Sequence, residues 1–419
     1  MADTIRVKFA DDSQAVFPKG TSLQIMAEQK QDKYASPIVA ARVNNVLTHI
    51  QERLEVDAKV DFFDLSTGQG IKVYERSLGF VMIVAAQRLF PGKSLVVEHS
   101  LGDGVYCELL LGRPLTEADV AALEEAMFDL VTEDLPIVRR MLPLGEAVRE
   151  FEACGYTGKA RLLRQLERAT VSVYSCGGII DYLYGPMLPR TGYLRRLELR
   201  FYAPGFIMRF PKKENPDQIP AFIDRPKLAQ ILLEAARWGK LLGCESVSDL
   251  NESMTDGSFA ETLRVAEALH EKKVAEIADM ADDKRHATRM ILIAGPSSSG
   301  KTTFAKRLGV QLRIHGIRPV RISLDDYFLD RDSTPRDESG EFDFESIDAL
   351  DLPLFNEHLV ELLAGRAVEP PRYNFRTGLR EYQGRRLSIG QDQILVIEGI
   401  HGLNPRLASS VPREHKLLV

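Results

Sequence analysis

The sequence contains few cysteines, one tryptophan and no long apolar stretch. The four cysteines are widely spaced and form no CxxC pair, which argues against both a disulfide framework and a cysteine metal site. They are Cys107, Cys154, Cys176 and Cys244. The amino terminus "MADTIRVKFADDS" lacks an apolar signal segment, and no run of about 18 apolar residues follows it. We therefore expect a cytoplasmic protein with buried, reduced thiols and no membrane partner.

An excess of positive charge is also missing. The formal net charge of −6 removes any overall electrostatic reason to expect nucleic-acid binding, although a local basic patch remains compatible with it. What is present is the composition of a globular protein, with 44% hydrophobic and 27% charged residues. A chain of 419 residues is too long for one ordinary core. The length therefore predicts roughly two to four domains.

Pattern changes along the chain predict three regions before residue 288. Residues 1–66 alternate short strands with one threonine-capped helix, which is typical of a small β-grasp domain. Residues 67–212 mix helical and strand-like patterns and predict an α+β domain. The stretch "PKKENPDQIP" is rich in proline and charge and marks a linker. Residues 213–287 are then expected to form a connecting helix bundle, with Ser258 and Glu261 capping its longest helix.

The stretch "GPSSSGKTT" at 295–303 fits the phosphate-loop pattern G-x-x-x-x-G-K-[ST]. The apolar run "MILIA" before it predicts a buried parallel strand, and the pattern after it predicts a helix. Glycines let backbone N–H groups surround phosphate oxygens, and a helix N-terminus adds positive potential. The structural alternative is a Ser/Gly-rich turn that happens to contain a lysine.

We therefore predict an α/β domain with a parallel sheet over residues 288–419, and ATP and Mg²⁺ as its cofactors. Lys301 is expected to reach the β and γ phosphates, and Thr302 to ligate Mg²⁺. The predicted ATP-binding residues are Gly295, Ser297, Ser298, Ser299, Gly300, Lys301, Thr302 and Thr303.

Two later strand patterns end in carboxylates. "RPVRISLDDYF" ends in Asp325 and Asp326, and "DQILVIEGIHG" leads to Glu398. The carboxyl ends of parallel strands share one edge, so all three would face a bound nucleotide. A carboxylate at that edge can hold Mg²⁺ or accept the proton of an attacking hydroxyl. The alternative is that Asp325 or Asp326 simply caps the following segment.

Two further stretches could meet a substrate. Residues 330–351 are rich in acids, which usually means a solvated surface, but aromatic residues beside Asp343 also suit a loop that closes over a polyhydroxy substrate. "PPRYNFRTGLR" adds Tyr373 and several arginines, including Arg372, which are suited to stacking and to anionic groups.

The segments "GPSSSGKTT", "ISLDDYF", "FDFESIDALD", "PPRYNF" and "ILVIEGI" occur in the order seen in the uridine kinase and phosphoribulokinase family of P-loop kinases. The resemblance covers about residues 288–419. It implies that Asp325 is the general base, that Asp343 contacts the acceptor's hydroxyls, and that Glu398 lies near the metal, with Asp326 as a further candidate ligand.

This chain departs from that family at two points. Asn374 and Gly378 stand where uridine kinases typically have Asp and His, so pyrimidine recognition does not carry over. The chain also stops at "EHKLLV", which resembles the first half of a strand, before the arginine-bearing lid of the family. We therefore expect an incomplete kinase domain, in which phosphoryl transfer would be slower without the lid's positive charge.

The first half resembles the amino-terminal part of threonyl-tRNA synthetase, a TGS module followed by an editing domain. "AAQRLFPGKSL" and "DYLYGPMLPRTG" carry the likeness, over roughly residues 1–205. Arg76 and Phe80 replace the two histidines of the H-S-x-x-H motif of that domain, and Leu183 and Met187 replace its Cys and His. Leu and Phe can neither ligate a metal nor move a proton, so we predict no deacylase activity.

The sequence thus favours an ATP-dependent kinase that phosphorylates a hydroxyl of a nucleoside-like small molecule or another polyol. A regulatory ATP-binding protein, whose first two domains recognise RNA or a protein, is the alternative, because about 200 residues lack catalytic groups at the editing positions. A scaffold with an inactive loop is less favoured, because Gly300, Lys301 and Thr302 are intact.

Overall fold

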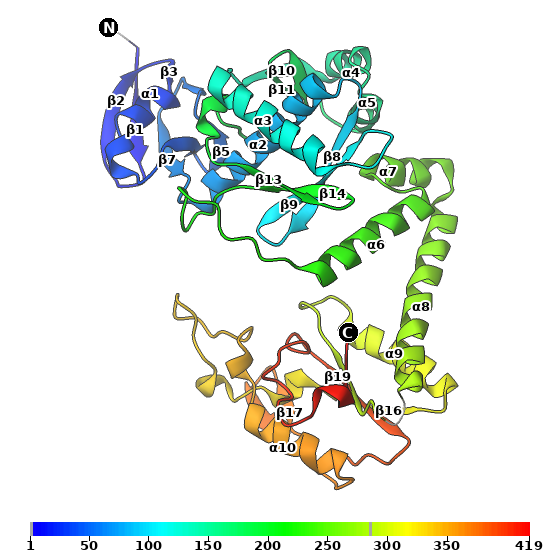
Figure 1. The fold of residues 1–419 in the computed structure, drawn as a ribbon. Coiled ribbons are helices and arrows are strands. Elements are labelled where there is room, and N and C mark those ends of the chain that lie inside the picture. The colour runs from blue at the N-terminus through cyan, green and yellow to red at the C-terminus, as the bar shows by residue number, and fades with distance from the viewer. Residues whose placement is uncertain (1–2, 285–286) are drawn as a thin grey trace. The chain divides into compact units, whose positions relative to one another are not determined.

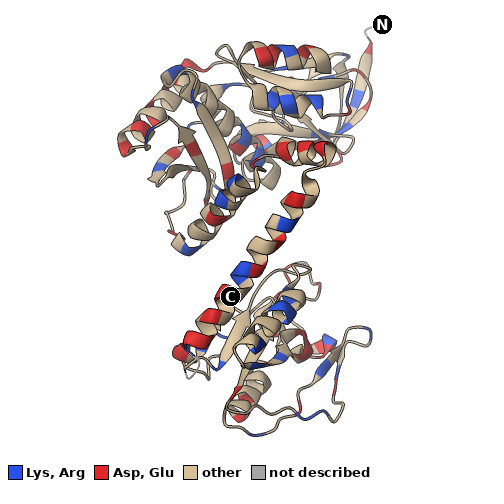
Figure 2. Cartoon of the chain, turned by 90° about the vertical axis from the view of Figure 1, so that its right-hand side faces the viewer, with Lys and Arg blue, Asp and Glu red and all other residues tan. Residues whose placement is uncertain are grey.

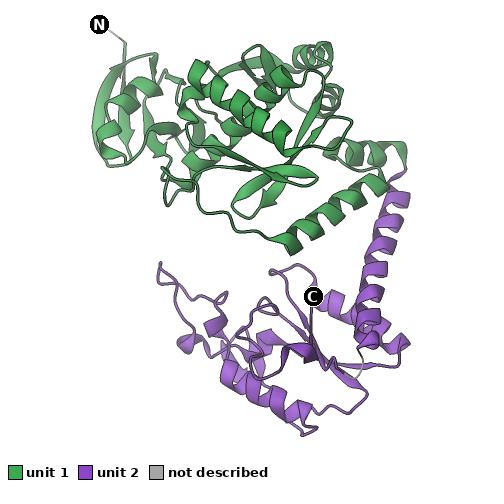
Figure 3. Ribbon diagram, viewed as in Figure 1, with its two compact units in different colours: residues 1–257 green, residues 258–419 purple. Residues whose placement is uncertain are grey.

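The computed structural model describes residues 3–284 and 287–419. Its contacts divide the chain into two compact units, residues 1–257 and residues 258–419 (Figure 3). The division lies between helix α7 (Val247–Asp256) and helix α8 (Phe259–Asp283), within the segment for which we predicted a connecting bundle. We call the two parts the first unit and the second unit.

The first unit begins with a five-stranded mixed sheet in the order β2-β1-β7-β4-β5 (Figure 1). Alternation in "TIRVKF" buries Ile5, Val7 and Phe9 on one face, where helix α1 (Leu23–Glu28) packs. Ser22 caps α1 by accepting a hydrogen bond from the Ile25 N–H, so the predicted threonine is not the cap. The strands are β1 (Thr4–Phe9), β2 (Gln14–Pro18), β4 (Ile38–Val43), β5 (Val46–His49) and β7 (Ala58–Asp64), with a separate pair β3 (Thr21–Ser22) and β6 (Arg53–Leu54).

Two antiparallel sheets and four helices follow in the first unit. Long helices α2 (Gly68–Leu89) and α3 (Glu117–Glu133) share one apolar core with the sheet β13-β14-β9-β8. Helices α4 (Leu144–Ala153) and α5 (Thr157–Arg164) cover the sheet β10-β11-β12. The strands are β8 (Ser94–Leu101), β9 (Gly104–Leu110), β10 (Val138–Pro143), β11 (Thr170–Cys176), β12 (Ile179–Asp181), β13 (Glu198–Tyr202) and β14 (Gly205–Arg209).

The helices after the linker do not form the predicted connecting bundle. Helices α6 (Pro226–Leu242) and α7 belong to the first unit, whereas α8 packs against helix α9 (Lys301–Ile314). An apolar stripe on α8 explains this, since Val274 and Ala278 are buried against α9 while charged residues alternate along the rest of the helix (Figure 2). Ser258 does stand at the N-cap of α8, but its side chain makes no capping hydrogen bond.

The four cysteines are free thiols. Cys107 and Cys176 are buried, in agreement with the expectation from the sequence. The expectation was wrong for Cys154, which is exposed because it ends helix α4 beyond the last residue that the helix buries. Cys244 is half-buried.

The second unit is built on a parallel sheet in the order β16-β19-β15-β20. Alternate residues of its central strands face two helical layers. Leu292 faces helix α10 (Leu352–Leu363), and Ile291 and Ile293 face α8 and α9. The strands are β15 (Met290–Ile293), β16 (Arg318–Ser323), β19 (Gln393–Glu398) and β20 (Lys416–Leu418), beside a hairpin of β17 (Arg372–Asn374) and β18 (Leu379–Glu381). The predicted α/β architecture with a parallel sheet is confirmed.

Strand register brings three carboxyl ends to the same level. Glu398 pairs with Ile293 on one side and with Ser323 on the other. The phosphate-loop segment therefore leaves β15 beside Glu398, and the Asp325–Asp326 pair leaves β16 next to it. The edge predicted from the sequence is formed.

Candidate active site

The segment from Gly295 to Thr303 joins β15 to the N-terminus of α9, as the sequence predicted. Gly300 has φ of 85°, a conformation that only glycine adopts without strain. A Cβ on Gly295 would lie 2.7 Å from the Ser299 Oγ, so the turn leaves no room for a side chain there. Lys301 Nζ donates a hydrogen bond to the Pro296 carbonyl oxygen at 2.9 Å across the loop. The result is a tight loop whose lysine and helix N-terminus supply positive charge together.

Thr302 and Glu398 meet at the carboxyl edge of the sheet. The Thr302 hydroxyl donates a 2.9 Å hydrogen bond to Glu398 Oε1. A hydroxyl and a carboxylate oxygen in contact are hard oxygen donors, the kind that Mg²⁺ prefers alongside water and phosphate. The donor set therefore fits one magnesium ion. Within residues 3–284 and 287–419, no group of three or more His, Cys, Asp or Glu side chains could hold a metal by itself.

Asp325 lies in the short 3₁₀ turn η3 (Leu324–Tyr327) that follows β16. Burial by surrounding protein raises the pKa of its carboxyl group, the Glu398 carboxylate raises it further, and Lys301 opposes both effects. Asp325 is therefore within electrostatic reach of Glu398 and Lys301. The structure thus gathers the predicted base, metal ligand and phosphate-binding lysine in one place.

Asp326 has a different set of neighbours. Burial raises the pKa of its carboxyl group, while a hydrogen bond from the Tyr373 N–H and the positive charges of Arg372 and Arg385 act against this rise. Asp326 thereby holds the start of the β17–β18 hairpin beside the sheet. Its hydrogen bond connects Asp326 to the hairpin, whereas the charges that act on Asp325 are those of Glu398 and Lys301.

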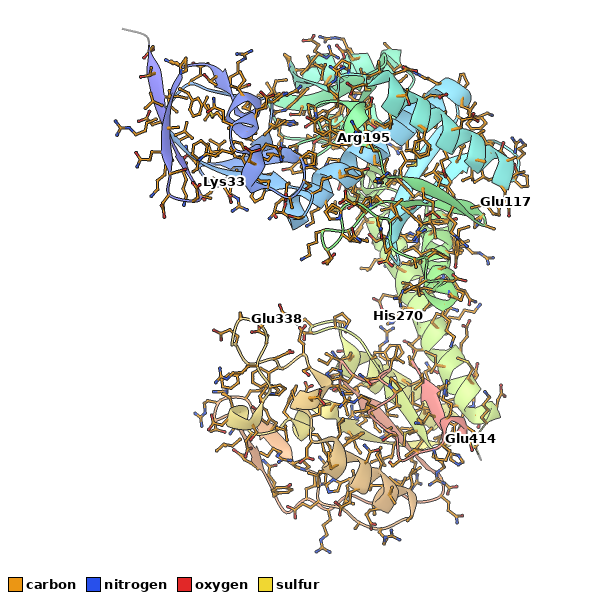
Figure 4. All side chains as sticks on the ribbon, turned by 60° about the vertical axis from the view of Figure 1, so that its left-hand side comes forward. Lys33, Glu117, Arg195, His270, Glu338 and Glu414 are labelled. Atoms are coloured by element: carbon orange, nitrogen blue, oxygen red, sulfur yellow. The ribbon has the colours of Figure 1, made fainter. Side chains whose placement is uncertain are left out.

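Asp343 takes part in a local turn. Its Oδ1 accepts hydrogen bonds from the Glu345 and Ser346 N–H groups, each at 3.0 Å. Other acids of this stretch make ion pairs, including Asp351 with Arg380. The stretch is therefore more ordered than a purely solvated acidic surface, although Glu338 stands at its outer tip (Figure 4).

Tyr373 is buried in an aromatic cluster beneath this stretch. Its ring centroid lies 5.6 Å from that of Phe328 and 5.0 Å from that of Phe375. In the part of the chain that the structure describes, its buried hydroxyl has no hydrogen-bond partner. A buried, unpaired hydroxyl costs free energy unless a ligand or water satisfies it, so the geometry keeps Tyr373 a candidate substrate contact.

A cavity of about 1050 Å³ opens beside this centre, lined by one face of α9, by β16 and by residues 370–387. Arg372 lines it, as do Thr302, Asp326 and Glu398. The sequence reasoning missed its other cationic residues, which are Lys306, Arg313, Arg321 and Arg385. The spacing of Lys306 and Arg313 could have indicated a shared face of α9, but nothing in the sequence brings three separate segments together.

In the first unit, the four editing positions are not arranged for chemistry. Phe80 and Met187 are core residues with exposed fractions of 0% and 2%, and Leu183 packs against the same core. Arg76 is half-buried and donates a hydrogen bond to the Pro186 carbonyl oxygen at 2.5 Å. Tyr174 fills the neighbouring space by donating to the Gly185 carbonyl oxygen at 2.6 Å. The centre is thus filled by packing and backbone contacts.

None of the helices in the described ranges combines the length and the apolar composition that a membrane crossing needs.

Comparison with known proteins gives a different relative for each unit. Residues 290–410 match the model of the Phosphoribulokinase / Uridine kinase family. The amino-terminal region matches the corresponding part of threonine–tRNA ligases, with 32% identity over 196 residues to that of Syntrophomonas wolfei and 30% over 229 residues to that of Methylococcus capsulatus. These alignments cover 46% and 54% of this chain but only 31% and 36% of the relatives, so the chain spans about a third of their length. Both resemblances inferred from the sequence are confirmed.

Among solved structures, similarity is found to "Structure of a Possible Uridine Kinase from Bacillus stearothermophilus", with 22% identity and a TM-score of 0.28. The alignment covers 35% of this chain and 80% of that one. A D-glycerate 3-kinase from Cryptococcus neoformans is similar with 17% identity and a TM-score of 0.23, over 32% of this chain and 52% of its own.

Proposed function

We propose that this chain transfers the γ-phosphoryl group of ATP to a hydroxyl of a small, nucleoside-like acceptor, and the match of residues 290–410 to the model of the Phosphoribulokinase / Uridine kinase family supports this. The single observation that carries the proposal is the meeting of Lys301, Asp325 and the Thr302–Glu398 pair at one edge of the parallel sheet. A phosphate site, a base and a metal site within reach of one another are what phosphoryl transfer requires.

Each group has a role that follows from its position. The loop amides and Lys301 bind the triphosphate, because they concentrate positive charge at the helix N-terminus. Thr302 and Glu398 hold Mg²⁺, and Asp326 is a further candidate ligand. The magnesium ion, when bound, neutralises charge on the phosphate oxygens.

Asp325 takes the proton of the acceptor hydroxyl. The oxygen then forms a bond to the γ-phosphorus as the bond to the β–γ bridging oxygen breaks, giving a phosphate ester and ADP. The raised pKa of Asp325 makes its carboxylate a better proton acceptor than an ordinary aspartate. Arg372 lines the adjoining cavity, and Asp343, Tyr373 and Arg372 are the proposed acceptor contacts.

The proposal is tested by measuring ADP release with Mg²⁺, ATP and a panel of nucleosides and sugars. Acceptor-dependent release is expected, and Lys301→Ala should lower it roughly a hundredfold or more. Arg386→Ala is the matched control, since Arg386 is an exposed cation outside the loop and the cavity. Lack of acceptor-dependent release, with ATP binding intact, would contradict the kinase proposal.

A second candidate is a regulatory ATP-binding protein in which the first unit recognises RNA or a protein. It is favoured by one observation, namely that a threonine–tRNA ligase-like region persists while its editing positions are filled by core residues. RNA affinity that changes when ATP is added would support it. RNA indifference together with acceptor-dependent ADP release would exclude it.

A further inference from the structure

The cavity beside α9 adjoins the centre proposed for phosphoryl transfer and extends away from it along α9. Its lining includes Thr302 and Glu398, but not Lys301, Asp325 or Asp343. It extends from the first turn of α9 to Arg313 in the last turn, which corresponds to about 16 Å along a helix axis. We call it the α9 groove.

The α9 groove has the opposite charge balance from the chain as a whole. Five cationic side chains line it, against the carboxylates of Asp326 and Glu398, whereas the full chain has a net charge of −6. The cations are Lys306, Arg313, Arg321, Arg372 and Arg385. A cationic cavity in an acidic protein concentrates the field that attracts small anions.

Few carboxylates in the described part of the protein neutralise the charges of these cations. Across the described residues, Lys306, Arg313 and Arg321 make no ion pair or side-chain hydrogen bond. Arg372 and Arg385 act on Asp326 only by longer-range attraction, because no hydrogen bond joins them. Elsewhere in the same unit, Arg307 pairs with Glu271 at 2.6 Å, so α9 does form ion pairs on another face. Like charges gathered in one groove repel each other, and this cost disappears when an anion binds.

The groove is built by helix periodicity and one close approach. Thr302, Lys306, Gly309 and Arg313 recur at intervals of three or four residues and therefore share one face of α9. Gly309 allows that face to approach β16, because a Cβ there would lie 3.3 Å from Pro319 Cγ. Lys306 and Arg313 are about 10 Å apart along the axis, so a ligand with two separated anionic groups can contact both.

We propose that the α9 groove is a binding site for a small molecule that carries two or more phosphate groups. Arginine guanidinium groups bind phosphate oxygens in pairs, and cations spread along the groove match separated phosphates. Because Thr302 and Glu398 also line the groove, a ligand bound there lies beside the proposed magnesium site. Binding in the groove and binding of Mg²⁺ with ATP then change each other's affinity by the same factor.

The test is calorimetric titration with fructose 1,6-bisphosphate as the probe and fructose as the unphosphorylated control, at low ionic strength without ATP. The bisphosphate should bind and fructose should not. The variant with both Arg321→Gln and Arg385→Gln should bind it at least tenfold more weakly. Arg386→Gln, which changes the exposed neighbour outside the groove, should leave the affinity unchanged.

Lys301→Ala separates the groove from the phosphate loop. If the probe binds the groove, this variant retains its affinity. If the probe does not bind, if its binding is lost in Lys301→Ala, or if the double variant binds normally, the groove is not a phosphate site and the inference is wrong. Thermal melting of the double variant, which should match or exceed that of the unsubstituted chain because repulsion is relieved, shows that any lost binding is not lost folding. None of these results depends on phosphorylation of an acceptor. A failure of this inference can therefore be distinguished from a failure of the proposed kinase function.

Discussion

The editing-like centre of the first unit and the phosphate-loop centre of the second unit use their polar groups differently. In the first unit, the polar side chains around the editing-like positions make hydrogen bonds within the protein. Tyr174 and Arg76 each donate to a backbone carbonyl oxygen. Ser77 donates to the Val73 carbonyl oxygen and accepts from the Leu188 N–H. In the second unit, the exposed Asp325 carboxyl group has a pKa raised by the surrounding protein and by Glu398, and the Tyr373 hydroxyl has no partner within the described part of the chain.

This difference distinguishes polar groups that stabilise the fold from polar groups that are free to act on a substrate. A satisfied polar group stabilises one conformation and has no remaining capacity to bind a substrate. An unsatisfied or desolvated group costs stability, and such costs are concentrated at functional sites. The contrast therefore predicts that substitutions at the phosphate-loop centre reduce activity while sparing or improving stability, whereas substitutions around the editing-like centre do the reverse.

The largest effect is expected from Asp325→Asn. Removing the proposed base should lower turnover roughly a hundred- to ten-thousand-fold while ATP binding persists. The same change should raise the melting temperature of the second unit at pH 7 in EDTA, because burial and Glu398 both disfavour the ionised carboxylate. ADP release, ATP titration and thermal melting measure the three quantities.

Asp337→Asn is the matched control for that prediction. Hydrogen bonds from Ser339 lower the pKa of the exposed Asp337 carboxyl group, so its charge is favourable where that of Asp325 is not. The control should show no gain in melting temperature and normal turnover. Undiminished turnover in Asp325→Asn would mean that another group takes the proton.

A smaller, pH-dependent effect is expected in the first unit at His49. Burial lowers the pKa of His49 to about 4, and the positive charges of Arg139 and Arg76 add to the effect. His49 pairs with the Tyr174 hydroxyl at 2.7 Å, which joins the first sheet to the following domain. Both states are neutral above pH 6.5, but only the unfolded chain takes up the proton between pH 6.5 and pH 4. Stability should therefore fall over that range, by about 3 kcal/mol at most.

Urea unfolding of the chain at several pH values, followed by a signal that reports on the first unit alone, checks this prediction. His49→Gln removes the titrating ring and should flatten the curve between pH 6.5 and pH 4. The control is His99→Gln, a change of a second histidine of the same unit whose ring stacks on Tyr106. A slope that survives His49→Gln unchanged would show that other groups cause the pH dependence.

The sequence predicted the second unit better than the first because its signals are local. The phosphate loop needs one strand, one glycine turn and one helix in immediate succession, and parallel register then brings Glu398 beside Ile293 without further information. The prediction of a connecting helix bundle was wrong for a related reason. The apolar stripe of α8 is visible in the sequence, but only packing shows that α9 is its partner.

The sequence could not predict which residues surround each carboxylate. Asp325 and Asp326 are adjacent in the chain, yet one interacts with Lys301 and the other with the Tyr373 N–H and Arg385. A short 3₁₀ turn sets this division, and its side-chain directions cannot be read from an acidic dipeptide. The α9 groove was missed likewise, because its cations come from a helix, a strand and a hairpin segment.

The next smaller effect is expected from Thr116→Ala in the first unit. Thr116 caps α3 in a reciprocal capping box with Asp119, which also pairs with Arg113. Loss of the cap should destabilise the first unit by about 1 kcal/mol and leave ADP release unchanged. Thr132→Ala on the same helix is the control, because its hydroxyl only donates back to the Phe128 carbonyl oxygen. Equal losses in both variants would show that the cap adds nothing specific.

Last in order of size, we expect the chain to have no effect on the rate at which mischarged tRNA is hydrolysed. The chain should not raise hydrolysis of mischarged tRNA above the buffer rate, because Phe80, Leu183 and Met187 offer neither a metal ligand nor a proton carrier. Arg76→His should not restore it, since the Tyr174 hydroxyl would still occupy the neighbouring space through its bond to Gly185. Hydrolysis above the buffer rate by the unsubstituted chain would contradict the comparison on which these predictions rest. It would mean that a centre filled by structural contacts retains chemistry, and that hydrogen-bond satisfaction does not distinguish the two units.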